Sequence, residues 1–100
     1  MNEIESKLKE LYNRIPRRHN PDNVKEIYSI IDELEDVLKT LEADSDQEKE
    51  VAHFFDALDP IRTTIKKSND NKASKKTKDV FFDEASGALK DTIEELMQQQ

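Results

Sequence analysis

Glu50 and His53 are the pair of residues whose types and spacing most resemble a known reactive site. The spacing Glu-x-x-His occurs in di-iron carboxylate bundles, which use two such motifs together with further inward-facing glutamates. This chain has a single copy, and Val51, Phe54 and Leu58 set the inward phase of the same predicted helix. Glu50 then lies at the edge of the apolar stripe, and His53 lies outside it. We therefore predict no metal ion and no other cofactor.

The sequence offers no other catalytic pattern. The chain has no cysteine, which excludes a thiol nucleophile, a disulfide framework and a thiolate metal site. Its single glycine cannot form a glycine-rich phosphate-binding loop. Serines and carboxylates are plentiful, but their spacing matches no catalytic arrangement. We therefore expect a protein that is not an enzyme.

Positive charge in this acidic chain is concentrated in two short stretches. The formal net charge is −7, but residues 60–78 carry seven basic side chains and one acidic one, and residues 1–18 carry five basic and three acidic ones. Such a distribution affects partners and association rates more than it affects the fold. The alternative is a solvated loop whose lysines serve solubility. The basic pole that we predict consists of Arg14, Arg17, Arg18, Lys66, Lys67, Lys72, Lys75, Lys76 and Lys78.

A run of acidic residues lies within the second predicted helix. Asp32, Glu33, Glu35 and Asp36 surround the apolar Leu34. This acidic face would present a row of negative charge that imitates DNA to a nucleic-acid-binding protein. The alternative is an ordinary solvated helix surface.

Two pairs of adjacent phenylalanines lie in the third and fourth predicted helices. Neighbouring side chains on a helix point about 100° apart, so one member of each pair faces the core and the other lies at its edge. We predict that Phe55 and Phe81 are the edge residues and, with Asp59, candidates for partner binding; the alternative is that both phenylalanines tuck between helices or under the basic loop. Phe55 and Asp59 also match F-x-x-x-D, which resembles the export signals of small helical proteins in Gram-positive type VII secretion, although the Trp-x-Gly turn is missing.

The elements that position these residues are expected to be helices. The chain has 100 residues, 34% hydrophobic content and one glycine, which favours a single all-α domain over a sheet with many tight turns. Apolar residues recur at alternating spacings of three and four. We predict four helices with a flexible basic loop at 68–77 before the last of them; the helices cover about residues 2–15, 21–42, 46–67 and 78–97.

Proline, asparagine and glycine residues mark special points of these helices. Pro16 ends the first helix, and Asn20 with Pro21 begins the second. Pro60 lies inside the third, which predicts a kinked helix or two short collinear helices with Asp59 capping the second. Gly87 lies in the middle of the fourth, either on the surface or at a close helix crossing.

An up-and-down bundle would bring the two basic stretches together. In that topology the first and third connections lie at one end, and the second connection lies at the other end with both termini. The prediction fails if a crossover connection replaces the simple meander. A further alternative has three long helices with the short N-terminal helix packed outside.

These observations together favour a small non-enzymatic protein-interaction module, such as an adaptor, a chaperone or an inhibitor of a partner protein. The alternatives are an anion- or nucleic-acid-binding protein that uses the basic pole, an acidic DNA mimic, and an immunity or secretion-associated helical protein. A homodimer is also possible, because a chain of 100 residues with 34% hydrophobic content has only a small core of its own. The chain shows no signal peptide and no run of 18 apolar residues, so we expect a cytoplasmic protein of bacterial or phage origin.

Overall fold

The structure, a computed structural model, describes residues 3–43 and 48–99. The regular structure of this part of the chain is entirely helical and forms one bundle, which confirms the all-α prediction. Its helices are α1 (Glu3–Arg14), α2 (Pro21–Glu42), α3 (Glu48–Ser68) and α4 (Lys75–Gln98).

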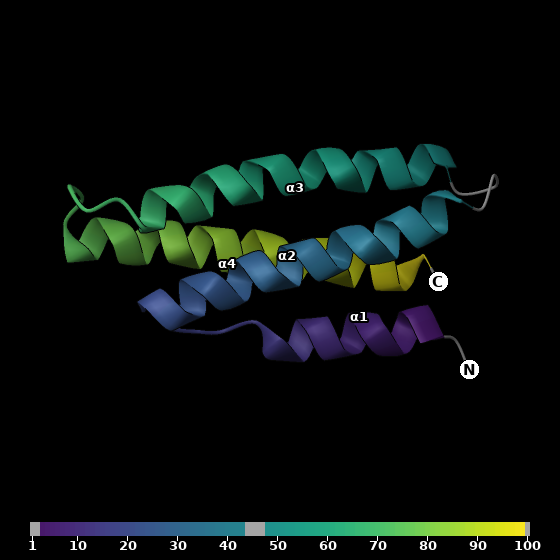
Figure 1. Cartoon of the computed structure of the whole chain (residues 1–100), viewed down its shortest axis with the longest axis horizontal. Coiled ribbons are helices and arrows are strands. Elements are labelled where there is room, and N and C mark those ends of the chain that lie inside the picture. The colour runs from purple at the N-terminus through teal and green to yellow at the C-terminus, as the bar shows by residue number, and fades with distance from the viewer. Residues whose placement is uncertain (1–2, 44–47, 100) are drawn as a thin grey trace.

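The helices alternate in direction, and each packs beside the helix that follows it (Figure 1). α4 also packs beside α1 and so closes the bundle, whereas α1 and α3 make no contact within the described residues. The bundle is a rod with extents of 45 × 23 × 17 Å. The α1–α2 and α3–α4 connections lie toward one end of this rod. The topology is therefore the predicted up-and-down meander.

α1 is the shortest helix, but it belongs to the bundle. Its Leu8 and Leu11 are fully buried, and the helix packs against both α2 and α4. The alternative prediction, in which the N-terminal helix packs outside three long helices, is therefore wrong. Ile4, Tyr12 and Ile15 pack against the same core from its edge.

The start of α2 follows the predicted capping pattern. The Asn20 side chain accepts a hydrogen bond from the backbone N–H of Asn23 at 2.7 Å, and Pro21 occupies the first helical position. This bond satisfies one of the amide groups that a helix leaves unpaired at its start. At the other side of the connection, α1 ends at Arg14, two residues before Pro16.

α4 begins earlier than the apolar pattern indicated. Its first residue is Lys75, three residues before the predicted start, and the Ser74 hydroxyl caps it by accepting a hydrogen bond from the Thr77 N–H. The connection is therefore residues 69–74 instead of the predicted loop 68–77. The stripe of apolar residues shows where a helix is buried, whereas the cap and the good helix propensity of lysine determine where this one starts. Two lysines of the predicted basic loop, Lys75 and Lys76, are consequently helical.

Pro60 lies inside α3 without dividing it. The helix runs unbroken from Glu48 to Ser68, so the alternative of two helices with Asp59 as a cap is wrong; a kink at the proline stays a prediction. Pro60 lies on the exposed face, where water can bond the carbonyl that loses its partner. The apolar phase continues across it, because Leu58 and Ile61 are both buried.

One continuous core runs through all four helices. Twenty hydrophobic residues of the described chain are buried in it, and within each helix most of them recur at the spacings of three and four residues found in the sequence. Gly87 lies outside this core. It is exposed, and a Cβ atom at its position would meet no other atom within 4 Å. The surface interpretation of this glycine is therefore confirmed, and the close crossing is excluded.

Candidate functional site

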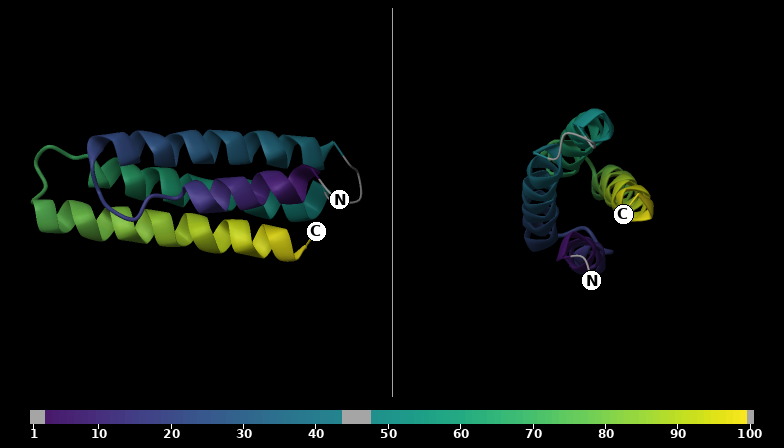
Figure 2. Two further views of the ribbon diagram at one scale, coloured as in Figure 1. Left: turned by 90° about the horizontal axis from the view of Figure 1, so that it is seen from below. Right: turned by 90° about the vertical axis from the view of Figure 1, so that its right-hand side faces the viewer.

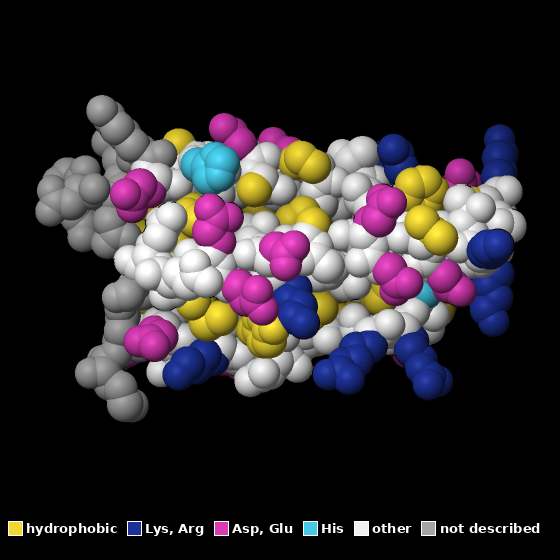
Figure 3. Space-filling view, turned by 180° about the vertical axis from the view of Figure 1, so that it is seen from behind, with side chains coloured by type: hydrophobic (Ala, Val, Ile, Leu, Met, Phe, Trp, Pro, Cys, Tyr) yellow, Lys and Arg dark blue, Asp and Glu magenta, His cyan; other side chains and the backbone are white. Residues whose placement is uncertain are grey.

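Most of the predicted basic residues lie at the end of the rod that holds the α1–α2 and α3–α4 connections. Figure 3 shows lysine and arginine side chains crowded toward this end of the bundle. The topology produces this arrangement, because two basic stretches separated by more than forty residues in the chain become neighbours. We name this region the basic end and define its cations as Arg17, Arg18, Lys66, Lys67, Lys72, Lys75, Lys76 and Lys78.

A cleft of about 300 Å³ lies between the α1–α2 connection and the first turns of α4. Arg17, Arg18 and Lys75 line it, so the structure joins cations from both predicted stretches in one site. Asp79 and Asp83 line the same cleft. The cleft therefore presents charges of both signs, with the cations in excess.

His19 anchors the connection that forms one wall of this cleft. Its ring packs edge-on against the buried ring of Phe82, with 5.6 Å between the centroids. Its Nδ1 lies 3.7 Å from a carboxylate oxygen of Asp79, and its Nε2 is buried without a hydrogen-bond partner in the described chain. The side chain is only 15% exposed, and it holds the connection against α4.

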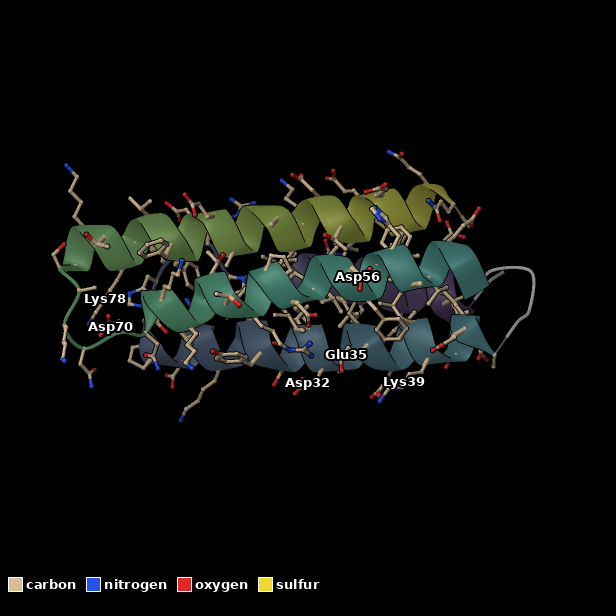
Figure 4. All side chains as sticks on the ribbon, turned by 90° about the horizontal axis from the view of Figure 1, so that it is seen from above. Asp32, Glu35, Lys39, Asp56, Asp70 and Lys78 are labelled. Carbon is tan, nitrogen blue, oxygen red and sulfur yellow. The ribbon has the colours of Figure 1, made fainter. Side chains whose placement is uncertain are left out.

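A second hollow, of about 620 Å³, lies where α3 ends and the α3–α4 connection begins. Lys66, Lys67 and Lys72 line it together with Asp70. Asp70 also shapes the connection, since its side chain accepts a hydrogen bond from the Lys72 N–H at 2.9 Å and its carbonyl accepts one from the Ala73 N–H. Figure 4 shows that Asp70 and Lys78 lie at this same end of the molecule.

Arg14 does not contribute free charge to the basic end. Its Nη2 lies 2.8 Å from a carboxylate oxygen of Glu26 and 2.6 Å from one of Glu33. Hydrogen bonds to Glu33 and then Glu26 raise the pKa of the guanidinium. The prediction that placed Arg14 in the basic pole is corrected, because α1 presents this side chain to α2.

Glu33 is the centre of this ion-pair network between α1 and α2. It accepts hydrogen bonds from Arg14 and from Lys7, whose Nζ lies 2.8 Å away. These bonds lower the pKa of Glu33 to about 2, against an opposing effect of burial. The same contact raises the pKa of Lys7. Glu33 therefore stays ionised at any ordinary pH.

The predicted acidic face of α2 is divided between two flanks of the helix. On the flank opposite Glu33, Arg62 of α3 pairs with Glu35 and lies 3.4 Å from Asp32, and Figure 4 shows both acids beside α3. Hydrogen bonding to Glu35 is the main cause that raises the pKa of Arg62. Asp36 is exposed and has no ion pair within the described residues. The acids do not form one continuous row of free charge.

Phe55 and Phe81 are each half-buried and lie far apart. The Lys67 Nζ lies 5.6 Å from the centre of the Phe81 ring, which is the distance of a cation–π contact. Phe55 lies twelve residues before Lys67 on α3, which corresponds to about 18 Å along the helix. The two rings therefore do not form a common patch. Asp59 is exposed, with Arg62 at 4.0 Å.

The described residues contain no group of three histidine or carboxylate side chains that could hold a metal ion, and Glu50 and His53 are both exposed. No helix among them is long and apolar enough to cross a membrane. Comparisons of the chain with protein-family models, curated proteins and solved structures give no significant match.

Proposed function

We propose that this chain is a small protein-binding module that docks through its basic end onto a predominantly acidic surface of another protein. The proposal rests on one observation: charged side chains are paired along α2, whereas cations are in excess at the basic end. Along the flanks of α2, cations and carboxylates neutralise each other in ion pairs. At the basic end, the cations outnumber the nearby carboxylates and Arg17, Arg18 and Lys75 are exposed.

The mixture of signs at this end favours a protein over a nucleic acid. Asp79 and Asp83 lie in the cleft, and Asp70 lies in the second hollow. A phosphate backbone has uniform negative charge and would be repelled by each of these carboxylates. A protein surface can place an acid opposite each lysine and a base or hydrogen-bond donor opposite each aspartate, which also provides specificity.

The net negative charge of the chain does not oppose this interaction at physiological salt. The rod is 45 Å long, whereas electrostatic interactions between exposed charges are screened over about 8 Å. A partner at the basic end therefore responds to the charges near it and not to those farther along the rod.

The proposal is tested with two double variants that change the net charge equally. Arg17→Glu with Lys75→Glu reverses two cations of the cleft, and Lys9→Glu with Lys39→Glu reverses two exposed cations elsewhere. The native chain is immobilised for affinity capture from lysate, and binding of the captured protein is then measured directly. We expect affinity at least about tenfold weaker for the cleft variant, with nearly native affinity for its control.

Two results would count against the proposal. Equal binding by both double variants would place the interaction elsewhere on the bundle. Capture that disappears after nuclease treatment, together with direct binding of the native chain to a random-sequence DNA duplex, would favour the nucleic-acid alternative instead. Such binding would weaken steeply with salt, with log K falling by about 0.9 per tenfold increase for each phosphate contacted.

A further inference from the structure

α1 occupies a distinctive place in the bundle. Viewed end-on in Figure 2, α2, α3 and α4 form three sides of the bundle, and α1 lies across the remaining side between α2 and α4. It makes no contact with α3 within the described residues. The surface beneath it is apolar, because Leu8 and Leu11 are fully buried in the common core. α1 is thus a cover over an apolar groove between two helices.

This cover is less firmly packed than the other helices. Leu8 and Leu11 are its only fully buried residues among those described, whereas α2 buries eight residues. A hollow of about 340 Å³ follows the seam with α2 beside Ile4 and Val37, and another of about 330 Å³ follows the seam with α4 beside Tyr12 and Gly87. Both hollows open to solvent at the surface of the bundle, so water reaches the seam on either side of α1.

Polar contacts provide much of the remaining attachment. Lys7 and Arg14 pair with Glu33, which lies on the α2 rim of the groove. On the α4 rim, the Tyr12 hydroxyl donates a hydrogen bond to Glu94 at 2.7 Å. The groove therefore has an apolar floor and acidic residues on both rims. Such a groove is suited to bind an amphipathic helix that has basic residues on both sides of an apolar stripe.

The chain can release α1 without losing the start of α2. His19 packs against Phe82 and Asn20 caps α2, so the connection is fixed to the bundle after residue 18. Residues 15–18, between this anchor and the end of α1, belong to no helix. The Arg18 carbonyl accepts a hydrogen bond from the Asn23 side chain at 2.6 Å, so Pro16 and Arg17 form the segment about which α1 can move.

We propose that α1 is a displaceable cover and that the groove beneath it binds an amphipathic helix of a partner protein. We expect the partner helix to have the pattern that α1 itself has in residues 7–14. Two leucines three residues apart, Leu8 and Leu11, face the groove. A basic residue lies directly before the first leucine, as Lys7 does, and another lies three residues after the second, as Arg14 does. This site adjoins the basic end, because Arg17 and Asp83 line both the hollow on the α4 seam and the cleft. It differs from the basic end in that its partner is basic.

The first test measures hydrogen exchange in the native full chain. If α1 is displaceable, its backbone amides exchange at least about tenfold faster than those in the centre of α3, because α1 opens without global unfolding. Equal protection of the two helices would overturn the proposal. This measurement needs no substitution and therefore cannot be confounded by a variant that fails to fold.

The second test measures binding of a fluorescent peptide that copies residues 3–15. Leu11→Ala in the full chain weakens the internal cover and leaves the groove unchanged, so we expect the peptide to bind at least about tenfold more tightly than to the native chain. Ile61→Ala is the matched control, because it removes a buried side chain from α3, none of whose described Cα atoms lies within 8 Å of a Cα atom of α1. That variant is expected to bind the peptide as the native chain does.

The acidic rims are tested with a peptide in which the positions of Lys7 and Arg14 are glutamate. We expect its binding to Leu11→Ala to be at least about tenfold weaker, because it faces Glu26 and Glu33. Equal affinity of the two peptides, or equal binding by all chain variants, would overturn the proposal. A dimer of the native chain that dissociates when the peptide is added would assign the groove to α1 of a second copy, and would overturn the claim of a separate partner.

Discussion

Glu33 shows how a single residue joins two elements of this bundle. It lies on α2 and accepts charge-assisted hydrogen bonds from Arg14 and Lys7, both on α1. Such bonds are stronger than those between neutral groups, and they hold the pKa of Glu33 at about 2. Because this folded-state pKa is below the ordinary value of 4.5, ionised Glu33 stabilises the fold above pH 4.5. The contribution is lost as the pH falls through about 2.

The prediction at this scale concerns Glu33→Gln. Removal of the charge should lower the free energy of unfolding at neutral pH by about 1 kcal/mol or less, since the pair is one-third exposed and screened by solvent. The difference from the native chain should shrink as the pH falls from 4.5 toward 2. Urea unfolding at several pH values measures it. Asp36→Asn is the control, and a pH dependence equal to that of Glu33→Gln would contradict the assignment.

At the scale of the element, the first turn of α4 conflicts with the helix dipole. Lys75 and Lys76 occupy the first two helical positions, and no acidic residue lies in that turn. The partial positive charge at a helix start disfavours each cation there by roughly 0.3–1 kcal/mol. At the end of α3, Lys66 and Lys67 lie where cations are favoured. The basic end therefore combines two lysines that stabilise α3 with two lysines that destabilise the start of α4.

This contrast gives a prediction from two substitutions of equal charge change. Lys76→Glu should raise the free energy of unfolding by roughly 0.5–1 kcal/mol, because it places an acid at the helix start. Lys66→Glu should lower it by a similar amount, because it places an acid in the last turn of α3. Denaturant midpoints measure both. A shift of the same sign in the two variants would mean that relief of repulsion among the lysines outweighs the dipole.

At the scale of the whole molecule, charge is separated along the rod. The chain has a net charge of −7, yet eight of its sixteen lysine and arginine residues belong to the basic end, where Figure 3 shows such side chains crowded together. A negatively charged surface therefore attracts the basic end of the rod and repels the rest of the molecule. We therefore expect the molecule to take a preferred orientation at an anionic surface.

The corresponding prediction concerns retention on a sulfonate cation-exchange resin at pH about 7.5 and salt of about 0.05 M. The native chain should be retarded despite its net charge, and salt above about 0.2 M should abolish the effect. Arg17→Glu with Lys75→Glu should flow through, whereas Lys9→Glu with Lys39→Glu should still be retarded. The two variants have the same net charge, so identical elution would show that the basic end does not act as a unit.

The sequence by itself determined the helices, their buried stripes and the up-and-down order. Spacing alone predicts which residues are buried, because residues three and four apart lie on the same face of a helix. Examples on α2 are Val24, Ile27, Ile31 and Leu34, which are all buried. Short connections then leave few ways to arrange four such helices. The gathering of basic stretches at one end follows from the same reasoning.

Only the tertiary structure decided which charges are free. Arg14 and Arg17 are three residues apart, yet α1 presents the first to Glu26 and Glu33 while the second lies exposed in the connection. The acids of α2 divide because the helix has α1 on one flank and α3 on the other. Periodicity reports which face of a helix is buried, but it does not report which neighbour lies along each edge of that face. Side chains at these edges pair with residues distant in the chain, so their charge state depends on the packing of the whole bundle.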